Sequence, residues 1–430
     1  MLKPGNFDVH SGTYFPCFTT SYNISLMSLY SSVLKNGLAL LLAARLDSIK
    51  APGVNVLYLM PIYLVGVLKG VNSPYAVRDY RAVNPEFGTL ADLRTLVDGA
   101  HARNMAVMLD WVANHTAWDH PWTTQHVDWY QRNAAGAIVS PSNNGVSYND
   151  VAQLDFNNGP MRREMISAIK SWVFTANVDG FRLDYADFQP NDFWQQANDT
   201  LRSIKTHKLL LLAEGTRTSN YSSGFDYNFG FAFYDAIKNV YRNGAPATAF
   251  DALNASEYTG SASGQHVVRY TTNHDVNSSD GTPVTLFNGD AGAMSAFVAA
   301  ALYKGVPLIY NGQEMGMRTA ITFPFTSVKV AWDAPDVTRA YKQLLAIRAG
   351  SVALRWGTPV SFSSAAVCAF TKTAGSEQAF VLVNTRNTPN TYALPAALAG
   401  TTWTNTLLGN TVTLGTQVQL PAYGYAVLKK

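Results

Sequence analysis

The sequence predicts a closed (β/α)8 barrel followed by an antiparallel β-sandwich. Short apolar runs, rich in leucine and β-branched residues, alternate with longer segments of helical spacing over about 300 residues. This alternation is typical of parallel strands that are covered by helices on both faces. It stops near Gly350, where short alternating runs separated by turn residues begin, as in a sandwich. No glycine-rich phosphate loop follows any of the strand-like runs, which disfavours a nucleotide-binding open sheet.

The barrel elements are expected in regular order along the chain. Buried strands are expected at 54–59, 105–109, 180–183, 209–213, 266–271 and 306–310, and helices at 91–104 and 161–176. The first fifty residues are less regular. There we expect the first barrel strand and its loop at 15–22, and the first helix at 26–49.

Two regions depart from the barrel pattern. The roughly 70 residues between the strands at 105–109 and 180–183 are rich in Trp, His, Asn and Ser, and they are too long for an ordinary loop. They predict a small subdomain inserted after the third strand. We therefore divide the chain into a barrel (1–110 and 180–350), an inserted subdomain with the third barrel helix (111–179) and a sandwich (351–430). Sandwich strands are expected at 360–363, 367–370, 380–383 and 425–428.

Composition and charge restrict the partners. The 32 Lys and Arg exceed the 29 Asp and Glu by three, a surplus too small to favour nucleic acid or an anionic membrane. The most apolar stretch, 37–46, is too short to span a bilayer. Cys17 and Cys368 cannot build a disulfide framework. The N-terminus lacks the charged and apolar regions of a signal peptide. A secreted or periplasmic location with the signal removed and a cytoplasmic location therefore both stay open.

Charged residues recur where the expected strands end. These positions carry Asp110, Arg182 with Asp184, Glu214, and His274 with Asp275. A single Asp after a strand usually caps a helix, and a single Arg–Asp pair is usually a salt bridge. Several carboxylates on one rim are harder to explain in this way, because burying uncompensated charge is costly. Enzymes built on a (β/α)8 barrel carry their active sites at the C-terminal ends of the strands.

Four of these strand ends form a recognisable set. Residues 110–115 (DWVANH), 180–184 (GFRLD), 213–215 (AEG) and 272–275 (TNHD) resemble, in order, the four motifs of the α-amylase family of glycoside hydrolases. Further stretches with the same resemblance lie at 73–75, 79–80, 84–89 and 305–314. Any one motif is a weak signal, whereas four in register are a strong one. The resemblance covers about residues 53–349 and implies a retaining enzyme that acts on α-glucans.

The resemblance also assigns roles to residues of this chain. It implies that Asp184 is the nucleophile, Glu214 the general acid and then base, and Asp275 the carboxylate that stabilises the distorted sugar. Arg182 lies two residues before Asp184, on the same side of the strand, and its charge would keep the nucleophile ionised. Three further residues match substrate-binding positions of the family: Tyr75 as a stacking platform, and His115 and His274 as hydrogen-bond partners of the sugar.

Asp110 matches a supporting position of the family, and two other sites depart from its pattern. Relatives often carry Lys-His three and four residues after the nucleophile, where this chain has Asp187 and Phe188. Asn114 matches a common calcium ligand, but Gln153 stands where a carboxylate ligand is expected. Because calcium prefers charged oxygens, we expect a weakened site, unless Asp150, Asp155 or backbone carbonyls supply one. No cofactor is required for the chemistry itself.

Several activities remain compatible with this set. The first hypothesis is an α-amylase that cleaves α-1,4 bonds within starch or maltodextrin. An α-glucosidase, a cyclomaltodextrinase or a transglycosylase would share the same catalytic residues. A non-catalytic binding subunit is a third class, but such relatives usually lose the nucleophile or the acid, and here Asp184, Glu214 and Asp275 are all present. The sequence does not distinguish endo from exo action, and it does not give the oligomeric state.

Overall fold

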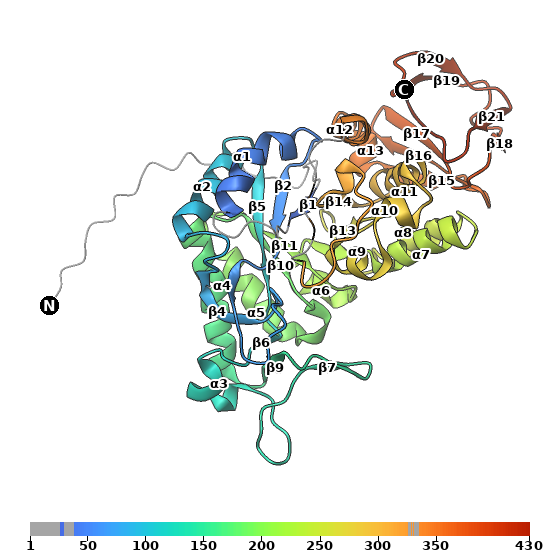
Figure 1. The fold of residues 1–430 in the computed structure, drawn as a ribbon. Helices are drawn as coiled ribbons and strands as arrows, with labels where there is room; N and C mark the ends of the chain where they lie inside the picture. The colour runs from blue at the N-terminus through green and yellow to red at the C-terminus, as the bar shows by residue number, and fades with distance from the viewer. Residues whose placement is uncertain (1–25, 30–37, 326–327, 329, 331–334) are drawn as a thin grey trace.

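Eight parallel strands close into a barrel in the structure, a computed structural model that describes residues 26–29, 38–325, 328, 330 and 335–430. The strand order around the barrel is β1-β14-β13-β12-β11-β10-β5-β2 (Figure 1). The strands are β1 (Leu26–Leu29), β2 (Val56–Leu59), β5 (Ala106–Trp111), β10 (Gly180–Leu183), β11 (Leu210–Ala213), β12 (Tyr227–Phe229), β13 (His266–Arg269) and β14 (Val306–Tyr310). The predicted (β/α)8 barrel is confirmed.

The first part of the barrel differs from the prediction. The expected helix at 26–49 is wrong in its first residues, because Leu26–Leu29 form β1, which pairs with β14 and β2. The helix α1 spans Leu38–Lys50. A short apolar run of this kind fits a buried strand or a buried helix equally well, so periodicity could not separate them. The strand expected at 15–22 lies outside the described residues.

Helices surround the barrel, and some of them, such as α2 and α4, begin at a side-chain cap. Thr89 accepts a hydrogen bond from the backbone N of Asp92, whose carboxylate accepts one from Thr89 N, and this capping box starts α2. Asn158 caps α4 in the same way, through Met161 N at 3.0 Å. The longer helices are α2 (Leu90–His101), α4 (Gly159–Ala176), α5 (Asn191–Arg202), α7 (Phe231–Arg242), α8 (Ala249–Ser256), α11 (Asp290–Leu302) and α12 (Pro335–Ala349). The shorter ones are α3 (Trp122–Gln125), α6 (Thr218–Ser222), α9 (His274–Asp280), α10 (Pro283–Leu286), α13 (Val352–Trp356), and the 3-10 turns η1 (Val127–Trp129), η2 (Ala186–Phe188) and η3 (Gln313–Met315).

Two insertions rise from the C-terminal ends of the barrel strands. The hairpin of β3 (Tyr63–Val65) and β4 (Val77–Val83) follows β2. After β5, the third barrel strand, come β6 (His115–Ala117), the turn of β7 (Ser142–Asn143) and β8 (Val146–Ser147), and β9 (Val151–Gln153), which pairs antiparallel with β6. Figure 1 shows this second insertion at the bottom of the view, far from the C-terminal strands. The predicted inserted subdomain is confirmed, and the residue bounds of the domains stay a prediction.

The C-terminal strands form the predicted sandwich. A six-stranded sheet has the order β15-β16-β17-β22-β19-β20, and β18 pairs with β21 in a second sheet. Its strands are β15 (Thr358–Ser361), β16 (Val367–Ala374), β17 (Glu377–Asn384), β18 (Asn390–Ala393), β19 (Thr402–Asn405), β20 (Thr411–Thr413), β21 (Gln417–Leu420) and β22 (Tyr425–Lys429). Phe380, Tyr392, Trp403 and Leu420 belong to the apolar cluster that joins the two sheets. Within the described part of the chain, no helix is both long enough and apolar enough to cross a membrane.

Candidate active site

The predicted catalytic residues meet at one cavity of about 580 Å³. Asp184 directly follows β10, Glu214 directly follows β11, and His274 and Asp275 lie in the segment that follows β13. All four line the cavity, together with Tyr75, Asn114 and His115. Because the carboxyl ends of parallel barrel strands lie on one rim, residues far apart in the sequence are brought together here.

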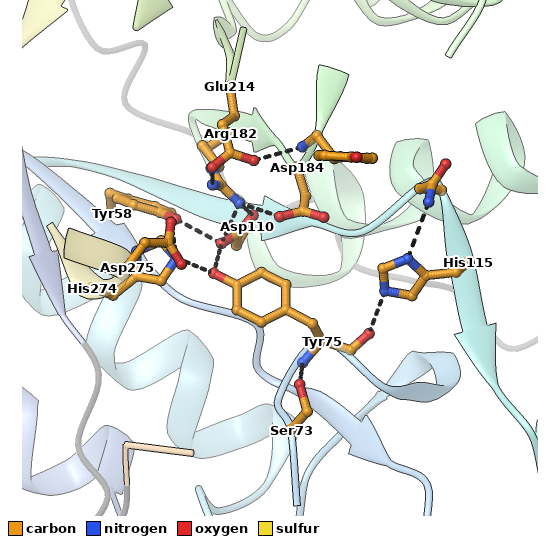
Figure 2. A network of polar contacts seen from close by, with 12 residues as sticks. Tyr58, Ser73, Tyr75, Asp110, His115, Arg182, Asp184, Glu214, His274 and Asp275 are labelled. Atoms are coloured by element: carbon orange, nitrogen blue, oxygen red, sulfur yellow. Dashed lines mark hydrogen bonds and ion pairs between the residues drawn. The ribbon is translucent and has the colours of Figure 1, made fainter. Parts of the chain in front are cut away.

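A buried guanidinium connects the carboxyl groups (Figure 2). Arg182 Nη1 lies 2.8 Å from Asp110 Oδ1 and 2.7 Å from Asp184 Oδ1, and Arg182 Nη2 pairs with Glu214 Oε1. The register of β10 against β5 places Arg182 beside Asp110. Asp184 comes two residues after Arg182, so both side chains point to the same face of the strand. Arg182 itself does not line the cavity, and it lies beneath the groups that do.

Burial shifts the protonation of both carboxyl groups. It raises the pKa of Asp184 to about 7, against the opposing charge of Arg182. It also raises the pKa of Glu214 well above its ordinary value, and Arg182 opposes that shift too. Each carboxylate disfavours the ionisation of the other, so the pair binds a proton more readily than two separate carboxyl groups would. Such a pair supplies both a proton donor and a carboxylate near neutral pH.

Tyr75 and His274 form a second network above Asp110. Tyr75 OH donates to Asp110 Oδ2 at 3.0 Å and contacts His274 Nε2 at 2.8 Å. His274 Nε2 also lies 3.2 Å from Asp275 Oδ2. Burial lowers the pKa of His274, so its ring is neutral at neutral pH. Since the Tyr75 proton is used by Asp110, His274 Nε2 is the donor to both Tyr75 and Asp275.

His115 is fixed from two sides. Its Nε2 lies 3.2 Å from the backbone O of Tyr75, and its Nδ1 lies 3.3 Å from Asn114 Nδ2. Burial lowers the pKa of His115 to about 4, so this ring is also neutral. A carbonyl can only accept, so Nε2 carries the proton and Nδ1 accepts from Asn114. The ring is therefore held at the cavity wall in one orientation.

The surroundings of Asn114 do not fit a calcium ion. Asn114 Oδ1 accepts from Gln153 Nε2 at 3.2 Å and from Gln189 Nε2 at 3.1 Å, so two amide groups use the oxygen that a cation would need. The carboxylate of Asp155 accepts from Asn157, and Asp150 lines the cavity. In the described ranges, no group of three or more His, Cys, Asp or Glu side chains could hold a metal. The weak calcium dependence expected from Gln153 stays a prediction.

Sequence reasoning missed Tyr58 and Tyr185, which shape the site, and it did not predict where the carboxylate of Asp187 lies. Tyr58 OH donates to Asp110 Oδ2 at 2.6 Å. The carboxylate of Asp187 turns away from the cavity and accepts from Thr216 N at 2.8 Å and from Asn220 Nδ2 at 2.9 Å. Tyr185 lines the cavity, and its backbone N donates to Glu214 Oε2 at 2.7 Å. The position of Tyr185, directly after Asp184, is the one signal in the sequence that could have identified it.

A barrel that brings Asp184, Glu214 and Asp275 to one cavity above a buried arginine defines a glycoside hydrolase of the two-carboxylate type. The family model for the α-amylase catalytic domain matches residues 41–139 and 145–372 of this chain. The chain belongs to the α-amylase family of glycoside hydrolases.

Individual relatives agree with this assignment. An α-amylase of Haloarcula japonica is 28% identical over 378 residues, which cover 83% of this chain and 54% of that protein. A cyclomaltodextrinase of Geobacillus thermopakistaniensis is 25% identical over 418 residues, covering 89% of this chain and 68% of that protein. The chain thus spans about half the length of the first of these relatives.

Solved structures share the fold over nearly the whole chain. A maltogenic α-amylase of Thermotoga neapolitana superposes with a TM-score of 0.83 at 23% identity, covering 95% of this chain and 98% of that chain. An α-amylase of Geobacillus thermoleovorans, solved in complex with acarbose, gives a TM-score of 0.80 at 22% identity, with the same coverage. At these identities the likeness concerns the fold.

Proposed function

We propose that this chain hydrolyses α-1,4-glucosidic bonds in starch, maltodextrin or related α-glucans, with retention of the α-anomer. The observation that carries the proposal is the pairing of Asp184 and Glu214 through one buried arginine, with Asp275 on the same cavity. The named activities of the relatives, α-amylase and cyclomaltodextrinase, support the substrate class.

The reaction proceeds by two displacements. Asp184 attacks the anomeric carbon and forms a covalent glycosyl-enzyme, while Glu214 gives its proton to the departing glycosidic oxygen. Glu214 then removes a proton from water, and the resulting attack on the glycosyl-enzyme releases the sugar and restores Asp184. Arg182 favours the ionised nucleophile, and the raised pKa of Glu214 favours the protonated acid. Asp275 stabilises the positive charge that develops on the sugar ring.

The remaining cavity residues orient the sugar whose bond is broken. Tyr75 presents its ring to that sugar, and its hydroxyl is fixed by Asp110 and His274. His115 and His274 are neutral, so they line the cavity without introducing charge, and their hydrogen bonds within the protein fix the orientation of both rings.

The first two tests examine the anomeric configuration of the first product and the role of Asp184 as the nucleophile. NMR of the first product should show the α-anomer before mutarotation, and an initial β-anomer would refute the proposal. Asp184→Asn should reduce turnover to background while the protein stays folded, because the substitution removes the nucleophile and little else. A binding subunit without catalysis would show no starch hydrolysis in the unchanged chain.

A second candidate is a cyclomaltodextrinase-like enzyme. It is supported by the match to the Geobacillus cyclomaltodextrinase, which covers 89% of this chain at 25% identity. A time course of products from soluble starch, maltotriose and β-cyclodextrin separates the two candidates. Long intermediates that appear early from starch would indicate endo attack by an amylase. Faster ring opening of cyclodextrin would indicate the second candidate.

A further inference from the structure

A buried glutamine connects the segment after the proposed nucleophile to the inserted subdomain. Gln189 lies five residues after Asp184 and has no exposed surface. Its Nε2 donates to Asn114 Oδ1 at 3.1 Å, across 75 residues of sequence. The Oε1 of the same side chain is buried and has no hydrogen-bond partner within the described part of the chain. An unpaired buried oxygen lowers stability, so stability alone does not account for a glutamine at this position.

The hydrogen bonds around Asn114 determine the orientation of each amide group. Gln153 Nε2 lies 3.0 Å from Asn114 O and 3.1 Å from Leu154 O, and because carbonyl oxygens only accept, this atom is the nitrogen. It also lies 3.2 Å from Asn114 Oδ1, which therefore accepts from two amide groups, those of Gln153 and Gln189. Asn114 Nδ2 is left to donate to Gln153 Oε1 and to His115 Nδ1, each at 3.3 Å.

The orientation of Asn114 sets the tautomer of His115. Since Nδ1 accepts from Asn114, the ring proton of His115 is on Nε2. That nitrogen lies 3.2 Å from Tyr75 O and donates to it. Tyr75 lines the cavity, so a chain of hydrogen bonds runs from the segment after Asp184 to the backbone of a residue at the cavity wall.

We propose that Gln189 is a positioning residue that acts on His115 through Asn114. In the orientation so fixed, His115 holds the backbone of Tyr75 at the cavity. This inference rests on the proposed function, in which Tyr75 presents its ring to the sugar whose bond is broken. Because Gln189 belongs to the segment that begins at Asp184, the same hydrogen bonds set the position of that ring relative to the nucleophile. A displacement of about 1 Å can cost about a hundredfold in rate, so loss of this link should lower kcat.

The test is a double-mutant cycle with maltohexaose as the substrate. Gln189→Met keeps the length of the side chain and removes its hydrogen bond, so kcat should fall about fivefold while KM changes less than about twofold. The Tm should change by less than about 2 °C, because the substitution removes an unpaired oxygen along with one donor. In the His115→Asn background, Gln189→Met should change kcat by less than about twofold, because the residue through which it acts is already missing.

Asn198→Leu is the matched control. Asn198 is a buried amide that donates to Ser223 O at 2.7 Å, its Oδ1 also has no partner within the described residues, and it does not line the cavity. Its replacement should leave kcat unchanged in both backgrounds. The proposal is overturned if Gln189→Met leaves kcat unchanged, if its effect is as large in His115→Asn as in the unchanged chain, or if Asn198→Leu lowers kcat equally.

The tautomer of His115 gives a second measurement, which does not depend on activity. NMR of the ring nitrogens in the unchanged chain, labelled at histidine and assigned with His115→Asn, should show the proton on Nε2. A proton on Nδ1 would overturn the proposal even if Gln189→Met does not fold. If the unchanged enzyme cleaves no α-glucan, the proposed function fails, whereas the tautomer still tests the hydrogen bonds from which the positioning role is inferred.

Discussion

Replacing Gln153 by alanine should destabilise the chain equally with and without calcium. Gln153 stands where the family resemblance leads one to expect a carboxylate ligand, and its amide bonds directly to Asn114 (Nε2 to O at 3.0 Å and to Oδ1 at 3.2 Å). The same Nε2 reaches Leu154 O at 3.1 Å, and Gln153 Oε1 accepts from Asn114 Nδ2 at 3.3 Å. These amide bonds join the segments of β6 and β9 without a metal.

The contacts set the size of the effect. Each hydrogen bond contributes about 0.5–1.5 kcal/mol net, and water replaces part of the set because Gln153 is only half-buried. We therefore expect the free energy of unfolding to fall by about 2–3 kcal/mol, which for a chain of 430 residues corresponds to a drop in Tm of about 3 °C. Activity should fall as well, because Asn114 also contacts the Nδ1 of His115.

The assay measures Tm and starch hydrolysis for the unchanged chain and for Gln153→Ala, each in chelator and in millimolar calcium. The unchanged chain should shift by less than about 1 °C between the two conditions, because a ligand with no tight site adds little stability. Gln153→Glu is a matched variant that keeps the length and adds a carboxylate, so its Tm should rise in calcium. Loss of most activity in chelator, restored specifically by calcium, would refute the reasoning.

Three further predictions concern the charged network. Glu214→Gln should reduce kcat/KM on starch far more than on α-maltosyl fluoride, whose leaving group needs no proton. Equal losses on the two substrates would show that Glu214 is not the general acid. Arg182→Met should lower stability at neutral pH by about 3–5 kcal/mol. This change raises the pKa of Asp184 further above its unfolded value. Denaturation curves should therefore show a smaller loss in the free energy of unfolding at pH 5, where Asp184 is protonated, than at pH 8. A loss that is the same at both pH values would contradict the argument. Asp187→Ala should lower kcat on maltodextrin and shift the pH profile of kcat, because the loop after Glu214 loses its contact at Thr216; rescue by Asp187→Asn, with KM little changed, would separate positioning from a fold defect.

The strands that the sequence predicts well are buried on both faces. The limits expected for β10 and β14 match those in the structure, because each is a short apolar run between polar or turn residues. The strand β12 went unpredicted because it has only three residues, with Asn228 in the middle. The first helix was placed too early for a similar reason: the residues of β1 carry no pattern that excludes a helix.

From the sequence, only those site residues that lie at the ends of barrel strands could be predicted. Asp110, Asp184 and Glu214 lie together because their strands are neighbours in a parallel barrel, which follows from the fold class. The contacts made by the insertions do not follow from the fold class. Gln189 reaches Asn114 across 75 residues, and the left-handed backbone at Tyr185 has no local sequence signal. Such contacts depend on how loops pack over the rim.

Two positions of this chain differ in charge from the pattern of the family. Gln153 replaces an expected calcium ligand, and Asp187 stands where a lysine is common. None of the described residues that line the cavity is Lys or Arg, and burial keeps His115 and His274 neutral. Arg182 is therefore the cation that balances Asp184 and Glu214, and the pKa of both carboxyl groups stays high because burial raises it and this single positive charge offsets the shift only in part. Substitutions at the cavity wall should accordingly change sugar binding, whereas substitutions at Arg182 should change the protonation on which the chemistry depends.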